Sequence, residues 1–79
     1  MTNNEKYIKA FVEAFDVAEA DVPNLKYQSI EAWDSVGHMG LIAALEEAFD
    51  IMMETDDIID FSSFEKGKEI LSQKYNVEF

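Results

Sequence analysis

The stretch WDSVGHMGLIAALEEAFDI, residues Trp33 to Ile51, decides the fold because it holds the clearest helical pattern in the chain. Its large apolar side chains recur at helical spacing, which places them on one face. These core-face residues are Leu41, Ile42, Leu45 and Phe49. Asp34 stands just before the run, where its carboxylate can accept hydrogen bonds from free backbone N–H groups of the first turn. We therefore predict a central helix with Asp34 as its N-cap and Ser35 in its first turn.

Ser35 is the candidate site residue that follows from this placement. A hydroxyl in the first turn of a surface helix is exposed and is held on a rigid element. An anion attached there would be stabilised by the free N–H groups and by the positive end of the helix dipole.

The opposite side of the predicted helix carries a short apolar stripe of Val36, Met39 and Ala43. Three acids follow it toward the C-terminal end: Glu46, Glu47 and Asp50. Acids near a helix C-terminus oppose the dipole, at about 0.3–1 kcal/mol each when exposed. Such local conflicts often mark function. We interpret this side as a surface for partner proteins; the alternative, that a few misplaced surface acids are tolerated, stays open.

Several short motifs, spread over nearly the whole chain, resemble those of the acyl carrier proteins. They are Asp34-Ser35-Val36, Leu45-Glu46-Glu47, Phe49-Asp50-Ile51, Asp57-Ile58 and Ser63-Phe64. In that family the serine after the aspartate receives a 4′-phosphopantetheine arm from coenzyme A, and the thiol of the arm carries an acyl group as a thioester. The resemblance implies that Ser35 is the attachment site, with Asp34 beside it. It also implies two kinds of partner, a phosphopantetheinyl transferase and the enzymes that load or transfer acyl or aminoacyl groups.

Two glycines separate this chain from many fatty-acid carriers. Gly37 and Gly40 stand where that group often has acids. Each glycine costs a helix roughly 1 kcal/mol relative to alanine, and glycine lets a partner approach the backbone closely. The departure points away from general fatty-acid synthesis and toward a dedicated stand-alone carrier. Polyketide, peptide and surface-polysaccharide precursor synthesis remain open as pathways.

The charge balance restricts the class of partner. Seventeen acids face six lysines and no arginine, which gives a net charge of −11. Between residues 10 and 60 there are thirteen acids and one base, Lys26. Nucleic-acid binding needs a basic footprint, which is missing here, and anionic membrane surfaces would repel the chain. We expect partner enzymes with basic docking patches; a generic solubility charge is the alternative.

The remainder of the chain predicts one small all-α domain over residues 1–79. Residues 3–15 show a helical pattern, residues 16–33 form a long connection, and residues 56–60 allow about one helical turn. Ser62 and Glu65 have the spacing of a capping box, which predicts a last helix from about residue 63. The expected fold is a small antiparallel four-helix bundle, three main helices plus one short helix, with a long first loop. No cationic start with an apolar run and no membrane-length apolar segment occurs, so we expect a cytoplasmic protein. We also expect it to be a monomer.

Enzymatic and metal-binding functions find little support in the sequence. His38, the only histidine, lies three residues after Ser35 but among core-face positions, so it resembles a packed histidine more than a base. The acids between residues 54 and 60 do not match the ligand and glycine spacing of an EF-hand loop. We therefore expect no catalytic residue and no dedicated metal site. The alternative function is a small acidic interaction module without covalent cargo.

Overall fold

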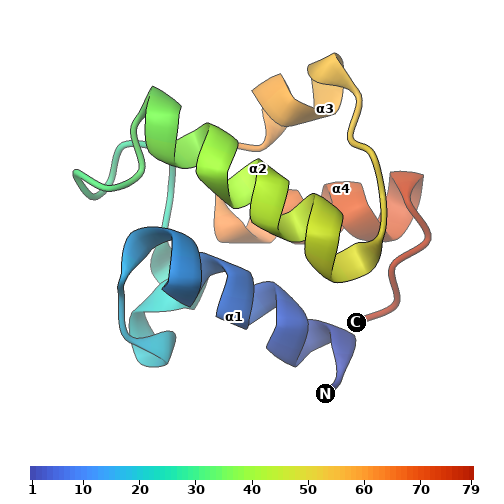
Figure 1. The fold of residues 1–79 in the computed structure, drawn as a ribbon, viewed down its shortest axis with the longest axis horizontal. Coiled ribbons are helices and arrows are strands. Elements are labelled where there is room, and N and C mark those ends of the chain that lie inside the picture. The colour runs from blue at the N-terminus through green and yellow to red at the C-terminus, as the bar shows by residue number, and fades with distance from the viewer.

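The computed structural model describes all 79 residues and contains helices without any β-strand. The five helices are α1 (Asn3–Phe15), the 3₁₀-helix η1 (Glu19–Asn24), α2 (Ser35–Phe49), α3 (Thr55–Asp60) and α4 (Phe64–Lys74). In Figure 1, α2 crosses the middle of the molecule, with α1 below it, α3 above it and α4 behind it. The predicted all-α class is therefore confirmed. None of these helices combines the length and apolar character that crossing a membrane requires.

Helix α1 begins and ends with local hydrogen bonds that its sequence supplies. The Thr2 hydroxyl accepts the backbone N–H of Glu5, and the Glu5 carboxylate accepts that of Thr2, so the two side chains form a capping box. At the other end Asp16 adopts the left-handed conformation and donates its N–H to the carbonyl of Val12. The predicted bounds, residues 3–15, are confirmed.

The long connection contains a helix that the sequence analysis did not predict. Residues Glu19–Asn24 form η1, which includes Pro23 and buries Val22. Beyond η1, the Phe64 N–H donates to the Leu25 carbonyl at 3.0 Å, and the Tyr27 N–H donates to the Ser62 carbonyl at 2.8 Å. These two bonds tie the connection to the start of α4.

Helix α2 starts as predicted. The Asp34 carboxylate accepts the Gly37 N–H at 2.8 Å, and Ser35 is the first helical residue. Leu41, Ile42 and Leu45 are buried, whereas Phe49 is only partly buried and packs beside the C-terminal tail. The predicted core face is thus correct for the middle turns of α2. In the last turn, Phe49 packs at the edge of the core instead of in its centre.

Helices α3 and α4 both begin within one residue of their predicted starts, but the cap of α4 differs from the predicted one. Helix α3 begins at Thr55, one residue before the predicted turn, and its N-cap, Glu54, makes no side-chain capping hydrogen bond. The N-cap of α4 is Ser63, whose hydroxyl accepts the Lys66 N–H at 3.0 Å. The predicted capping box that starts at Ser62 is wrong, because the Ser62 backbone is already engaged with the long connection.

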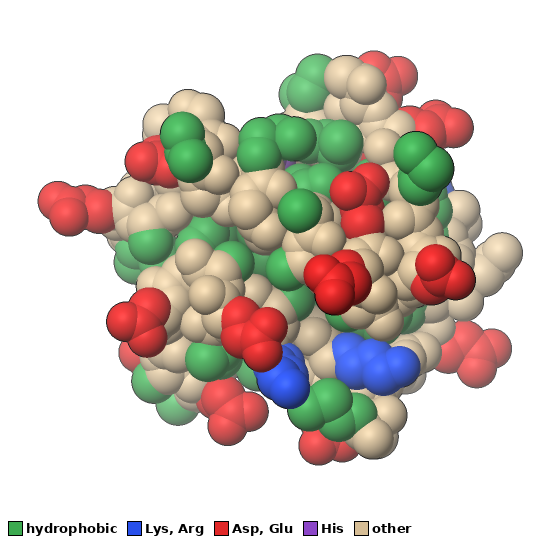
Figure 2. All heavy atoms as spheres, in the orientation of Figure 1, with side chains coloured by type: hydrophobic (Ala, Val, Ile, Leu, Met, Phe, Trp, Pro, Cys, Tyr) green, Lys and Arg blue, Asp and Glu red, His purple; other side chains and the backbone are tan.

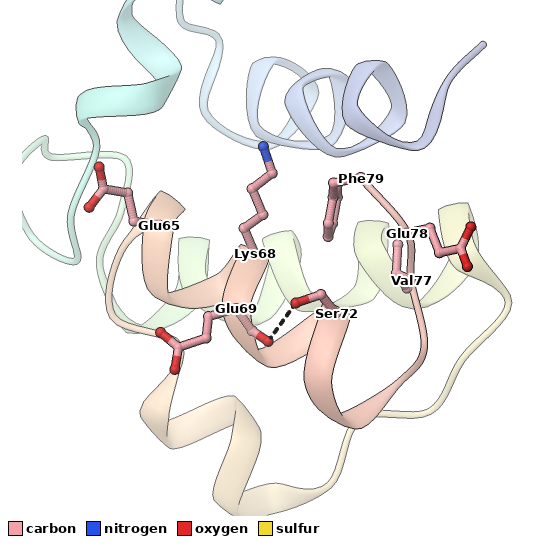
Figure 3. Close-up of a pocket in the computed structure, with 7 residues that line it drawn as sticks. All are labelled: Glu65, Lys68, Glu69, Ser72, Val77, Glu78 and Phe79. Atoms are coloured by element: carbon pink, nitrogen blue, oxygen red, sulfur yellow. Dashed lines mark hydrogen bonds between the residues drawn. The ribbon is translucent and has the colours of Figure 1, made fainter.

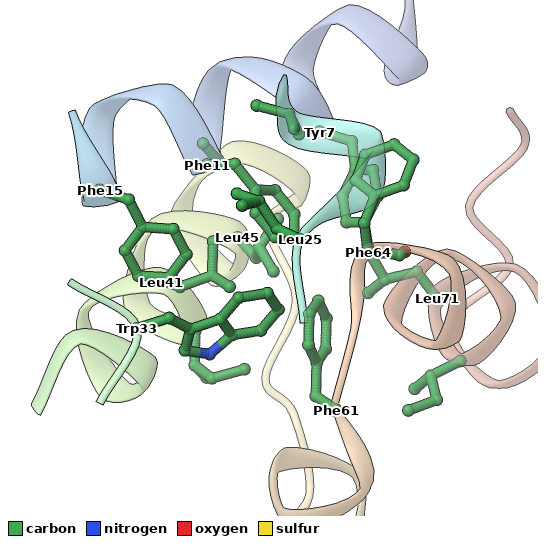
Figure 4. Close-up of a cluster of buried hydrophobic side chains, with 14 of the residues drawn as sticks. Tyr7, Phe11, Phe15, Leu25, Trp33, Leu41, Leu45, Phe61, Phe64 and Leu71 are labelled. Carbon is green, nitrogen blue, oxygen red and sulfur yellow. Dashed lines mark hydrogen bonds between the residues drawn. The ribbon is translucent and has the colours of Figure 1, made fainter. Parts of the chain in front are cut away.

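The core is one cluster of 16 buried residues dominated by aromatic rings (Figure 4). Phe11 makes edge-to-face contacts with Tyr7, Phe64 and Trp33, so rings from α1, the connection and α4 meet in the centre. The Tyr7 hydroxyl donates to the Phe64 carbonyl at 2.6 Å, which satisfies the buried phenol. Burial raises the pKa of Tyr7 above its ordinary value, so the phenol stays protonated.

The two glycines of α2 occupy different environments. A Cβ atom at Gly37 would collide with the backbone carbonyl of Ala32, whereas at Gly40 it would meet no atom within 4 Å. Gly37 therefore allows the preceding loop to pack against the first turn, and only Gly40 leaves its backbone open on the surface. The interpretation that both glycines admit a partner is wrong for Gly37.

Alanine at these two positions is expected to change stability in opposite directions. Gly37→Ala forces a shift of the Ala32 backbone and destabilises by about 1–3 kcal/mol, as overpacking does. Gly40→Ala adds helix propensity at an open position and stabilises by up to about 1 kcal/mol. Urea denaturation followed by circular dichroism measures both variants. Equal effects of the two substitutions would contradict this view of the first turn.

Candidate functional site

Ser35 lies at the exposed N-terminal end of α2. Asp34 caps the Gly37 N–H, and the His38 N–H donates to the Asp34 carbonyl at 2.7 Å. The N–H groups of Ser35 and Val36 have no acceptor within the protein. The predicted arrangement is thus present: an accessible hydroxyl beside two free backbone donors at the positive end of a 15-residue helix.

An apolar cleft of about 370 Å³ opens directly beside Ser35. Its walls come from α2, from α3 and from the loops on either side. The lining residues are Tyr27, Ser35, His38, Met39, Ile58, Ile59, Phe61 and Ser62. Sequence reasoning did not find this cleft, because Tyr27 and Ser62 lie in segments without periodicity and join it only through the contact between the connection and α4.

His38 fixes one side of the cleft through both ring nitrogens. Its Nδ1 accepts the indole N–H of Trp33 at 2.9 Å, and its Nε2 lies 2.7 Å from the carbonyl oxygen of Ile58. An indole nitrogen only donates and a carbonyl only accepts, so these contacts assign the neutral tautomer with hydrogen on Nε2. Neither nitrogen is left to take a proton from Ser35, which agrees with the prediction that His38 is a packed residue.

A polar network attaches α3 to the end of α4. The carboxylate of Asp57, only 3% exposed, accepts hydrogen bonds from Lys74 Nζ and from the Tyr75 hydroxyl, each at 2.6 Å. The Tyr75 hydroxyl in turn accepts the Glu54 N–H at 2.8 Å. The Lys74 and Tyr75 bonds lower the pKa of Asp57, and Asp57 raises that of Lys74. Asp57 therefore serves as an anchor for the helix that forms one wall of the cleft.

The predicted stripe on α2 is exposed. Val36 is 82% exposed and Met39 53%, and Ala43 and Glu47 are exposed further along the same side. Figure 2 shows hydrophobic side chains gathered over α2 and α3 and acidic side chains over the C-terminal half of α2, while the basic side chains visible on this face lie over α1. Met39 and Ser35 both line the cleft, so the stripe and Ser35 lie next to each other.

The three predicted acids are not equivalent. The carboxylate of Glu46 is partly buried and accepts the Met53 N–H at 3.0 Å, so it holds the segment between α2 and α3. Asp50 is exposed but ends the helix in the left-handed conformation, with φ 53°. The expectation that Glu46 is a free surface acid is therefore wrong, and Glu47 remains as the exposed acid within the helix.

A second hollow lies away from Ser35, between α4 and the C-terminal tail (Figure 3). Lys68 points toward α1, where its Nζ lies 3.1 Å from Asn4 Oδ1 and 5.2 Å from the centroid of the Phe79 ring. The Ser72 hydroxyl donates to the Glu69 carbonyl. Because its central lysine already holds the tail and α1 together, we interpret this hollow as structural.

The Asp57 network predicts a specific loss of stability in acid. A carboxyl whose pKa is lower in the folded state stabilises the fold above its unfolded-state pKa, about 3.9, and this contribution disappears as the pH falls through the folded-state pKa. Asp57→Asn should therefore lower the free energy of unfolding most near neutral pH, and the gap from the unmodified protein should narrow below about pH 4. Urea denaturation between neutral pH and acid tests this, with exposed Asp56→Asn as the control. A gap that is constant over this range would contradict the role of Asp57.

Ser35, the cleft and the stripe adjoin one another at one end of α2. Comparison of the chain with known protein families, curated proteins and solved structures finds no match. A function for this site must therefore be inferred from its own residues.

Proposed function

We propose that this protein is a stand-alone carrier of the acyl carrier protein type, with a 4′-phosphopantetheine arm on Ser35. The observation that carries the proposal is the accessible Ser35 hydroxyl at a helix start, next to an apolar cleft. The Asp34-Ser35-Val36 motif agrees with it, as does the order of the later motifs. Together with this function we propose the antiparallel four-helix bundle of that family, a cytoplasmic location and a monomeric state.

The residues around Ser35 suit a phosphodiester. The free N–H groups of Ser35 and Val36 offer hydrogen bonds to phosphate oxygens, and the helix dipole favours negative charge there. Asp34 is occupied with the Gly37 N–H and holds the first turn in place. When bound, the arm supplies a thiol that carries an acyl or aminoacyl group as a thioester.

The chain itself carries cargo and performs no catalysis in this proposal. Both nitrogens of His38 are engaged with Trp33 and Ile58, so no base is available to Ser35 within the protein. A phosphopantetheinyl transferase must therefore supply the base that takes the proton of the Ser35 hydroxyl. Coenzyme A donates the arm and would leave as 3′,5′-adenosine diphosphate when its pyrophosphate bond breaks. Loading and transfer enzymes then act on the cargo.

The exposed side of α2 is the proposed docking surface for these enzymes. Val36, Met39 and Ala43 provide a small apolar anchor, and Gly40 lets a partner approach the backbone. Glu47 and Asp50 continue the surface with negative charge. A carrier must release each partner after use, which favours weak contacts steered by charge: an exposed ion pair contributes only about 0.2–1 kcal/mol.

Modification of Ser35 tests the proposal directly. Incubation with coenzyme A and a broad-specificity phosphopantetheinyl transferase should raise the intact mass by one arm. Ser35→Ala should abolish the addition while helical circular dichroism stays unchanged, because the substituted side chain is exposed. The control is Ser72→Ala, which removes an exposed serine on α4. This variant should receive the arm to the same extent as the original protein.

The same experiment separates the carrier from the alternative, an acidic interaction module that uses the exposed stripe without covalent cargo. The alternative is favoured by the 82% exposure of Val36, which is large for an apolar side chain without a partner. Failure of several transferases to modify Ser35 would support the interaction module.

Association with the transferase should depend on salt and on the charge of α2. Raising the ionic strength from about 0.01 M to 1 M shortens the Debye length from about 30 Å to about 3 Å, so the association rate constant should fall markedly. Glu47→Lys should lower it further at low salt. Glu78→Lys in the tail makes the same change in net charge and should have a smaller effect. Stopped-flow or surface-binding experiments measure these association rate constants. If the rate constant changes neither with salt nor with Glu47→Lys, the acidic surface has a role in solubility alone.

A further inference from the structure

His38 connects two elements beside the site through its two ring nitrogens. Its Nδ1 accepts the indole N–H of Trp33 at 2.9 Å, and its Nε2 donates to the Ile58 carbonyl at 2.7 Å. An indole nitrogen only donates, so the Trp33 contact needs an Nδ1 that carries no hydrogen. The fold therefore uses His38 as a neutral ring whose one ring hydrogen is on Nε2.

A second proton on this ring would remove one contact and spare the other. An imidazolium carries N–H groups on both nitrogens, so its Nδ1 would face the Trp33 N–H as donor against donor. The contact with Ile58 needs no change, because Nε2 already donates there. Protonation would therefore break the link to Trp33 and leave the link to α3 in place.

No acid beside the ring compensates for this loss. Neither ion pair of the protein involves His38, so no carboxylate oxygen lies within 4.0 Å of its ring nitrogens. On α3 the carboxylate of Asp57 is occupied by Lys74 and Tyr75, and at the start of α2 that of Asp34 caps the first turn. The other ionisable side chains on the elements packed against the ring are exposed; they are Lys26, Tyr27, Glu31, Asp56 and Asp60. A charged His38 would thus gain no ion pair in return for the lost hydrogen bond.

Trp33 is the anchor that this change would release. It is the only buried side chain among residues 26–40, the stretch that contains the site. Its ring packs against Phe15 and Phe61 in the aromatic core (Figure 4). The Gln28 N–H donates to the Trp33 carbonyl at 2.9 Å, so the preceding loop is tied to the same residue. A weaker hold on the indole therefore weakens the attachment of the whole segment to the core.

We propose that His38 is a positioning residue whose protonation in mild acid releases Trp33 and weakens the attachment of the segment that presents Ser35. Histidine is the side chain whose charge ordinarily changes between about pH 5 and 8, and His38 is the only histidine in the chain. The contact is therefore present above this range and is lost as the pH falls through it. The release of Trp33 is a property of the fold alone, whereas its effect on the modification of Ser35 rests on the carrier function proposed above.

Trp33 is the only tryptophan, so its fluorescence reports the release directly. The experiment measures the acrylamide quenching constant of the full chain from about pH 8 to about pH 5, and follows the resonances of the Trp33 indole N–H and the His38 ring by NMR. Loss of the acceptor for a buried donor should shift the equilibrium between docked and released Trp33 by roughly 5- to 150-fold toward release. Quenching should rise with the same midpoint as the His38 resonances. A quenching constant that stays the same over this range would overturn the proposal.

His38→Gln removes the titrating group and keeps the hydrogen-bonding groups. Glutamine offers an oxygen that accepts and an amide that donates, and it takes up no proton in this range. Quenching in His38→Gln should not change with pH, and a rise equal to that of the original protein would overturn the proposal. The matched control adds Ser72→His to His38→Gln, which returns a histidine to an exposed position on α4 and should leave quenching independent of pH. If His38→Gln does not fold, the agreement or disagreement of the Trp33 and His38 midpoints in the original protein decides the question.

The effect on Ser35 is measured with the transferase. At each pH the rate of arm addition to the original protein is divided by the rate for His38→Gln, which cancels the pH dependence of the enzyme itself. This ratio should fall as the pH is lowered from about 8 to about 5, and a constant ratio would overturn the coupling to Ser35. Failure of the carrier function appears separately, as an unchanged mass at every pH, while the fluorescence of Trp33 still tests the release.

Discussion

The hydrogen bond between the indole of Trp33 and the imidazole of His38 is the contact on which the site depends. Trp33 is fully buried and packs against Phe11 and Phe15 of α1, so it fixes the end of the long connection on the core. Its indole N–H donates to His38, and the other ring nitrogen of His38 donates to the Ile58 carbonyl, so the same histidine also holds α3 in place. A buried indole N–H without this partner would cost about 1–3 kcal/mol. One short chain of polar contacts thus sets the positions of the loop before Ser35, the first turns of α2 and the opposite wall of the cleft.

The first turn of α2 is built to leave Ser35 free. Asp34 takes the Gly37 N–H, and the absence of a side chain at Gly37 lets the carbonyl of Ala32 approach the helix. The loop therefore packs closely against the first turn, while Ser35 stays exposed and the N–H groups of Ser35 and Val36 remain without an acceptor in the protein. The roughly 1 kcal/mol that a glycine costs within a helix is offset by this close approach. A site residue on such a helix start needs no movement of the protein to become accessible.

Helix α3 is held chiefly by polar contacts. Its one buried residue is Asp57, tied to Lys74 and Tyr75, and Ile59 is 71% exposed. A six-residue helix contributes little stability of its own, so these bonds and the Ile58 carbonyl keep it against the molecule. The cleft therefore has one rigid wall, α2, and one wall whose position depends on a few hydrogen bonds and one ion pair.

Much of the fold could be predicted from local pattern. Helical spacing of apolar residues predicted α1 and α2, and the Asp34 cap predicted where α2 begins, because the groups that end a helix lie within a few residues of one another. The same reasoning identified Ser35 as an exposed hydroxyl and the Val36, Met39 and Ala43 side as solvent-facing. It failed at η1, at the cap of α4 and at Glu46, where a partner distant in the sequence or a short irregular segment decides the outcome.

The sequence by itself determined the helical class, the position of Ser35 and the acidic character of the surface, since each depends on residue type and short-range spacing. Only the tertiary structure decided that an apolar cleft opens beside Ser35, because its lining residues are drawn from the connection, α2, α3 and the approach to α4. Only the tertiary structure likewise joined Trp33 to His38 and Asp57 to Lys74 and Tyr75. The physical reason is that caps and helix faces follow from neighbours along the chain, whereas clefts and polar networks form where separate elements meet, which no spacing within one element encodes.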